Sequence, residues 1–286
     1  MFKRQLVRND YFVAWANGSG LALHATGFPD SLKVEMVNDA KNILRNSKCY
    51  LILPPEDYSF GSVASPDGVS GSDLREALRW SYAKEADMDL STCCIETLAV
   101  PGGEGQALVR ASYWVFAVEQ DRLKSCILLH QKLKRKVSSV DVIALAQRNL
   151  GWALALGRGV GSVATVVVGE HYSAIGVADG EGNLLFHKQF DATESGLKTD
   201  AGKERLLLEL QRSLGYFERR LANVGISKGF VFGSDVEIVG EYLTKNLGGF
   251  EWQKGDYPGV SLVGFQPQIG GEVAWLVGGL LRCRNE

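Results

Sequence analysis

The amino-acid sequence predicts an α/β protein made of two related lobes with mixed sheets. Short apolar strands joined by glycine-containing turns open both halves of the chain, at 12–25 and at 164–190. In the second half, three such strands are followed by a long amphipathic helix, a fourth strand and another helix. A chain of 286 residues, 45% of them hydrophobic, can bury one large core or two cores of ordinary domain size.

The first strands are expected at 12–16 and 21–25, joined by the hairpin-type turn Asn17-Gly18-Ser19-Gly20. A strand at 48–53 stops at Pro54-Pro55. Residues 56–71 are rich in Gly, Ser, Pro and Asp and are expected to form a loop. A helix with Ser72 or Asp73 as its cap then runs to residue 86.

Strands at 92–100 and 111–118 flank a glycine-rich turn. The helix expected at 120–134 has Leu123, Ile127, Leu128 and Leu133 as its apolar side, and Asp141 is expected to cap the next helix, at 141–156. Lys132, Lys134, Arg135 and Lys136 lie where the first of these helices ends. They have two interpretations: favourable charge at a helix C-terminus, or a patch that faces anionic lipid.

The second half begins with the β-branched run 164–168, which is typical of a buried strand. Strands at 173–178 and 184–190 complete a meander, and a helix at 202–223 carries six apolar residues on one side. A strand at 229–232, a glycine turn and a helix at 236–247 follow, and a strand at 260–265 and a helix at 272–282 end the pattern.

Composition excludes several classes of protein. The net charge is only −2, whereas nucleic-acid binding calls for a clear basic excess. The first ten residues have no apolar run after them and do not resemble a secretory signal, and the longest apolar run, 273–281, is too short to span a bilayer. We therefore expect a soluble cytoplasmic protein that reaches a membrane only through a partner.

Familiar catalytic motifs are missing from the sequence. The five cysteines form no CxxC pair, and the four histidines show no ligand spacing, so no metal site is expected. The glycine-rich segment 157–162 precedes a strand instead of opening a helix, which rejects a dinucleotide loop. Neither a Walker lysine motif nor a Gly-x-Ser-x-Gly elbow occurs. No residue is therefore predicted to be catalytic.

Two lobes with this strand order resemble the actin and sugar-kinase fold, a ribonuclease H-like architecture. The resemblance divides the chain into a first lobe, 1–156, with an inserted subdomain at about 55–118, and a second lobe, 157–286. In that fold, one glycine turn in each lobe faces the phosphates of a nucleotide and an Asp beside each turn holds magnesium or its waters. Here Ala16 and Val167 stand where the acids are usual.

The resemblance implies a degenerate nucleotide pocket. Its remnants are Gly18, Ser19 and Gly20 in the first turn, Gly169 and Glu170 in the second, and Gly233 and Ser234 where adenosine is usually held. Each has a plainer interpretation, because turns need glycine and Ser234 or Asp235 can cap the helix that follows. Arg212 and Arg219 share a helix face, which suits either ion pairs or a phosphate or partner contact.

Several segments resemble, in the same order, the PilM-type proteins of type IV pilus systems. They span residues 50 to 282, and each is weakly specific by itself. The segments are Leu51-Ile52-Leu53-Pro54, the Leu-x-x-Ala-Leu-x-Trp helix 74–80, the Val-Asp segment 140–146 with Asn149, the Arg-Ser-Leu-x-Tyr-Phe helix 212–221, Phe232-Gly233-Ser234-Asp235 and the final helix 274–282.

Within this family, the short chain and the degenerate turns look most like the MSHA biogenesis branch, the MshI-like proteins, with the cytoplasmic domain of type II secretion GspL as a relative. The resemblance implies a cytoplasmic adaptor, peripheral to the inner membrane, whose first lobe holds the cytoplasmic tail of a PilN-like single-pass protein among other platform proteins. ATP or ADP is the ligand its pocket would take. The alternative is an ATP-binding or ATP-hydrolysing switch in which Glu170 or Asp191 replaces the lost carboxylates.

Overall fold

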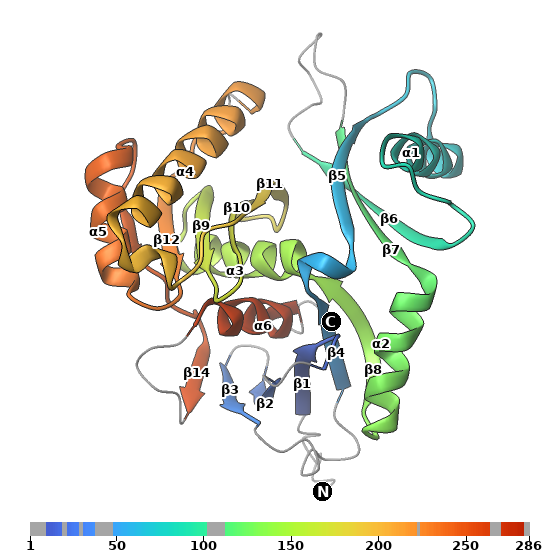
Figure 1. Cartoon of the computed structure of the whole chain (residues 1–286), viewed down its shortest axis with the longest axis horizontal. Helices are drawn as coiled ribbons and strands as arrows, with labels where there is room; N and C mark the ends of the chain where they lie inside the picture. Colours follow the sequence, from blue (N-terminus) through green and yellow to red (C-terminus); the bar gives the residue numbers. More distant parts are fainter. Residues whose placement is uncertain are drawn as a thin grey trace, which may run out of the picture.

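The computed structural model describes residues 10–18, 22–28, 31–37, 48–101, 112–221, 224–263 and 270–282. It contains two large mixed sheets and one small antiparallel sheet (Figure 1). Two helices, α3 (Ile143–Arg158) and α6 (Gly271–Leu281), lie side by side between the two large sheets. Among the described residues, no helix is both long enough and apolar enough to cross a membrane.

The first large sheet has the strand order β14-β3-β2-β1-β4-β8. Strands β1, β2 and β3 form an antiparallel meander, and β4 and β8 extend it in parallel from β1. Strand β14 pairs in parallel with β3, so a segment near the end of the chain completes this sheet. The strands are β1 (Asp10–Trp15), β2 (Ala22–Phe28), β3 (Ser31–Met36), β4 (Lys48–Leu53), β8 (Lys136–Val142) and β14 (Val260–Val263).

The second large sheet repeats this plan in the order β11-β10-β9-β12-β13. Again three strands form an antiparallel meander and two more extend it in parallel. The strands are β9 (Ser162–Val168), β10 (Ser173–Asp179), β11 (Leu184–Phe190), β12 (Lys228–Phe232) and β13 (Trp252–Lys254). Helices α4 (Asp200–Arg220) and α5 (Val236–Leu247) accompany it. This repetition confirms the predicted two-lobed α/β fold.

The inserted subdomain is a three-stranded antiparallel sheet, β5-β7-β6, on which α1 (Gly71–Glu85) packs. Its strands are β5 (Ser59–Ala64), β6 (Cys93–Val100) and β7 (Ser112–Glu119). Helix α2 (Gln120–Lys132) then leads back to β8. Two short 3₁₀ helices, η2 (Pro55–Asp57) and η3 (Gly196–Lys198), precede β5 and α4.

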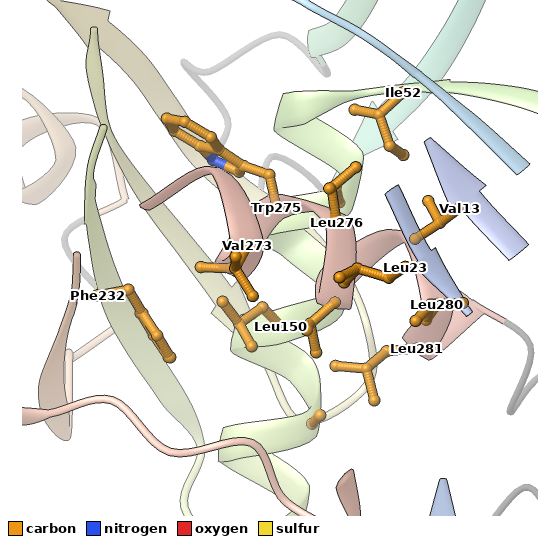
Figure 2. Close-up of a cluster of buried hydrophobic side chains, with 14 of the residues drawn as sticks. Val13, Leu23, Ile52, Leu150, Phe232, Val273, Trp275, Leu276, Leu280 and Leu281 are labelled. Atoms are coloured by element: carbon orange, nitrogen blue, oxygen red, sulfur yellow. The ribbon is translucent and has the colours of Figure 1, made fainter. Parts of the chain in front are cut away.

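The largest core cluster joins the two sheets through the paired helices (Figure 2). Leu276 and Leu280 of α6 face Val13 and Ile52 of the first sheet, while Leu150 of α3 lies on the side nearer Phe232 of the second. At the closest helix contact, a Cβ added to Gly278 would lie 2.1 Å from the carbonyl oxygen of Ala146. Only glycine permits that close approach of α6 to α3. The two packed helices bring both large sheets into one continuous core.

Some element predictions were wrong. The stretch 56–71 is not all loop, because it contains β5, whose large apolar residues Phe60 and Val63 stand among Gly, Ser and Pro. Helix α1 begins at Gly71, and no side chain caps it. Strands β3 and β13 were not expected. The predicted strand 260–265 is β14 over its described part, 260–263.

Asp141 does not cap a helix but lies in β8, and α3 begins only at Ile143. The strand can bury this carboxylate because Oδ1 accepts a hydrogen bond from the N–H of Val142 at 2.9 Å and Oδ2 lies 3.4 Å from Arg282. Two charged and polar partners therefore offset the cost of desolvating the acid. Periodicity could not reveal this, because the partners are set by the tertiary fold.

The apolar side predicted for α2 was wrong in part, since Leu123 and Ile127 are only half-buried. Its buried residues are Cys126 and His130, while Leu128 and Leu133 are 54% and 45% exposed. His130 is held inside by a 3.1 Å contact between Nε2 and the carbonyl oxygen of Trp15. Arg135 folds back onto the ring of Phe12 at 4.5 Å and onto His130 Nδ1, so it is not part of an open basic patch.

Trp114 of β7 connects the inserted subdomain to the second lobe. Its Nε1–H donates a buried hydrogen bond to the carbonyl oxygen of Leu184 at 2.7 Å. We expect Trp114→Phe to lower the free energy of unfolding by about 1–2 kcal/mol, since it leaves that oxygen unpaired. Trp80→Phe, on the exposed side of α1, is the control and should have little effect in denaturant titration. Equal losses in the two variants would contradict the assigned role.

Candidate functional site

The first glycine turn follows β1. Ala16 is buried, and its N–H donates to the carbonyl oxygen of Ile52 at 2.8 Å. Gly18 has φ of +76°, a backbone conformation that favours glycine. A Cβ there would lie 2.8 Å from Leu129 Cδ2, so the turn packs closely against α2. The predicted site residues Ser19 and Gly20 lie outside the described residues.

The second glycine turn joins β9 to β10 over residues 169–172. The N–H of Gly169 donates to the carbonyl oxygen of Tyr172 at 3.0 Å. The N–H of Glu170 donates instead to the carboxylate of Glu272, at 2.6 Å from Oε1. Glu272 stands in the first turn of α6, so a side chain from another element occupies the anion-binding face of this turn.

The third remnant, Gly233-Ser234, follows β12. Both polar hydrogens of Ser234 are donated to Glu194: its N–H to Oε1 at 3.0 Å and its hydroxyl to Oε2 at 2.8 Å. The N–H of Gly271, at the start of α6, also donates to Oε1, at 3.2 Å. Ser234 therefore does not cap α5, and Asp235, at the cap position, makes no side-chain cap hydrogen bond.

Glu194 and Glu272 together form what we call the carboxylate clamp. They accept hydrogen bonds from the N–H groups of Glu170, Ser234 and Gly271. These are backbone donors at two loops and a helix start, the kind of group that binds phosphate. A phosphate at this place would have to displace both side chains and would meet their negative charge.

Electrostatics around the clamp disfavour a further anion. Burial raises the pKa of the Glu272 carboxyl, and the nearby charges of Glu194 and Glu170 raise it further, against the lowering effect of the Glu170 N–H. A cavity of 460 Å³ opens beside the clamp. Its titratable lining is three acids, one lysine and one histidine: Glu170, Glu194, Asp235, Lys198 and His171.

The predicted remnants are only partly brought together. Glu170 and Ser234 line the cavity beside the clamp, and Gly169 and Gly233 approach the clamp carboxylates. Gly18 lies elsewhere, next to α2. Aromatic rings connect the two turns, because Trp275 stacks on Tyr172 at 4.9 Å and meets the edge of Trp15 at 6.3 Å. Within the described chain, no three His, Cys, Asp or Glu residues are grouped to hold a metal ion.

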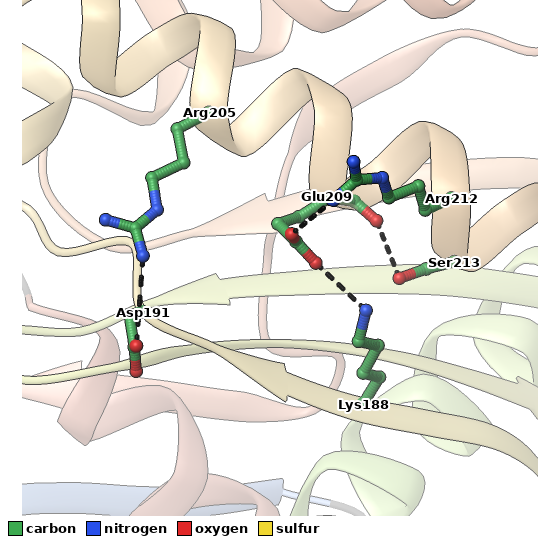
Figure 3. A network of polar contacts seen from close by, with 6 residues as sticks. All are labelled: Lys188, Asp191, Arg205, Glu209, Arg212 and Ser213. Carbon is green, nitrogen blue, oxygen red and sulfur yellow. Dashed lines mark hydrogen bonds and ion pairs between the residues drawn. The ribbon is translucent and has the colours of Figure 1, made fainter.

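Asp191, one of the acids considered as a replacement ligand, is 90% exposed and lies 3.8 Å from Arg205 (Figure 3). Arg212 pairs with Glu209 on its own helix at 3.4 Å. Glu209 also accepts from Lys188 of β11 at 2.9 Å, so this ion pair joins α4 to the sheet. Glu194 and Glu272 were not among the predicted site residues, because isolated glutamates after a strand and at a helix start form no recognisable pattern.

Comparison with solved structures places the fold. The PilM–PilN type IV pilus biogenesis complex contains a chain with a TM-score of 0.64 and 16% identity, covering 98% of this chain and 99% of the other. The cytoplasmic domain of EpsL, an inner-membrane component of the Vibrio cholerae type II secretion system, gives 0.52 and 12%, covering 97% and 94%. This chain has their actin-like fold. Neither a protein-family model nor a curated protein sequence matches it.

Proposed function

We propose that this chain is a non-catalytic cytoplasmic adaptor, peripheral to the inner membrane, in the assembly platform of a type IV pilus or a type II secretion system. An MSHA-like pilus, with MshI-like proteins as the nearest branch, is our specific proposal. The observation that carries the proposal is the carboxylate clamp. Its two side chains hold, from within the chain, the N–H groups on which a nucleotide's phosphates would depend.

The chain would act by binding a partner protein and not by catalysing a reaction. Ala16 and Val167 stand where this fold usually has the two acids that hold magnesium or its waters. The clamp joins the second turn, the β12–α5 turn and the start of α6 without a ligand. It would keep the scaffold in one conformation, which suits a protein whose task is to present a binding surface.

The partner would be the cytoplasmic tail of a PilN-like membrane protein, as the PilM–PilN complex suggests. Helix α2 of the first lobe supplies a surface for it. Leu128 and Leu129 are exposed there and, with Lys132, help to line a cavity of 370 Å³, while Leu133 is exposed one residue beyond the end of the helix. Exposed leucines grouped beside a cavity are suited to bury apolar side chains of an extended tail.

Retention of such a tail on the immobilised chain tests the proposal. We expect the tail to be retained with or without Mg-ATP, and Leu128→Glu with Leu133→Glu to weaken retention at least about tenfold by placing charges in an apolar contact. Leu208→Glu, at an exposed leucine of α4, is the matched control. No phosphate release above background is expected. Failure to retain any platform tail, or turnover of Mg-ATP, would contradict the adaptor and favour the nucleotide-gated switch.

A further inference from the structure

A third cavity, larger than the other two, lies at the other end of α4 from the clamp. It has a volume of 650 Å³, within the usual range for small-molecule sites. Its walls are β5 and β7 of the inserted subdomain, the outer strand β11 and the C-terminal half of α4, which face one another in Figure 1. We call it the cationic cleft. It goes beyond the proposed function, which does not use it.

The lining of the cationic cleft has four cations, Lys188, Arg212, Arg219 and Arg220, and no acid. Glu209 forms ion pairs with Lys188 and Arg212, as Figure 3 shows. Arg219 and Arg220 have no acidic partner in the part of the chain that the structure describes. Arg220 instead donates to Ser62 Oγ at 3.3 Å and to the Tyr216 hydroxyl at 3.0 Å. Two guanidinium groups at one cavity without an acid leave a strong attraction for an anion.

Aromatic rings stand beside these guanidinium groups. Phe60 stacks on Trp114 at 5.0 Å, and the Arg220 guanidinium lies 5.8 Å from the Trp114 ring and 6.0 Å from the Tyr216 ring. Tyr216 is 46% exposed, so it can still receive a flat ligand. Rings and guanidinium planes in one cavity form a surface for stacking a planar group.

His187 of β11 also lines the cleft. Its side chain is only 4% exposed, and neither ring nitrogen has a hydrogen-bond partner among the described residues. Burial lowers the pKa of this imidazole to about 3, so at neutral pH it offers one donor and one acceptor without charge. A buried polar group without a partner costs free energy.

We propose that the cationic cleft binds a ligand that carries both a phosphate and a planar ring, the chemistry of a nucleotide, at a place separate from the glycine turns. Arg219 and Arg220 would hold the phosphate, since guanidinium groups offer paired donors that match its oxygens. Tyr216 and the Arg220 plane would stack the ring. Because no carboxylate lines the cleft, binding would not need magnesium.

Calorimetric titration of the full chain with ADP and GDP, each in EDTA and in magnesium, tests the proposal. We expect binding in both solutions and a loss of at least about tenfold in affinity in Arg219→Gln, and in Arg219→Gln with Arg220→Gln, the loss expected when hydrogen bonds to a charged group are removed. Tyr216→Ala should also weaken binding. Pyrophosphate and adenosine, titrated separately, should each bind more weakly than ADP.

Two controls locate the site. Arg205→Gln removes the same charge from α4 outside the cleft, and Lys198→Gln removes the lysine beside the clamp. Both should leave nucleotide affinity unchanged. Absence of nucleotide binding overturns the proposal, as does equal weakening in Arg205→Gln or a loss confined to Lys198→Gln. Binding of a glutamate-rich peptide with no nucleotide binding would also overturn it, in favour of an acidic protein partner.

Discussion

Glu194→Ala is expected to lower the free energy of unfolding by about 3 kcal/mol. The carboxylate accepts three hydrogen bonds, from the N–H and the hydroxyl of Ser234 and from the N–H of Gly271. Hydrogen bonds to charged groups contribute about 1.5–3 kcal/mol each, and partial exposure reduces that value here. Relief of repulsion with Glu272 offsets part of the loss, but three donors lose their acceptor at once.

Denaturant titration at neutral pH measures this effect. Asp191→Ala is the control, because it removes an exposed carboxylate three residues away whose nearest cation is 3.8 Å distant. Glu194→Gln should lose less than Glu194→Ala, since an amide oxygen can still accept one of the backbone donors. A loss below about 0.5 kcal/mol in Glu194→Ala, the range of ordinary surface changes, would mean that the clamp does not hold the turns in place.

The general architecture could be predicted because local patterns determine it. The β-branched run of β9 and the long apolar side of α4 are properties of neighbouring residues, which sequence periodicity records. Strand β5 was missed because its apolar positions are few and stand among residues that usually form turns. Asp141 was misplaced because a buried acid in a strand depends on Arg282, 141 positions away.

The site was predictable only in part for the same reason. Glycine at the turns could be located, because Gly18 and Gly233 need positive φ and lie next to recognisable strands. The acceptors of the turn N–H groups could not, since Glu272 reaches Glu170 across 102 residues. What distinguishes a nucleotide pocket from a scaffold that holds its own turns is therefore a tertiary contact. The residues at positions 16 and 167 could not show which side chains the N–H groups of the second turn contact.

Acidification is expected to destabilise the fold through His187. Burial lowers the pKa of this imidazole from its ordinary 6.5 to about 3 in the folded chain. Between those two pH values the imidazole is protonated in the unfolded chain but not in the folded chain. The free energy of unfolding therefore falls as the pH falls. Each pH unit of that window corresponds to about 1.4 kcal/mol, which gives on the order of 3 kcal/mol between pH 7 and pH 4.

Urea titrations of His187→Leu at pH 7 and pH 4 isolate this contribution. Asp141 and Glu272, whose pKa values are raised by burial, act in the opposite direction, so the difference between variant and parent chain is the quantity to compare. We expect the variant to lose about 3 kcal/mol less than the parent chain on acidification. Gln189→Leu, in the same strand, should change stability equally at both pH values. If His187→Leu and the parent chain respond alike, folding does not lower the pKa of the imidazole, and its assignment as a buried group without a hydrogen-bond partner would be wrong.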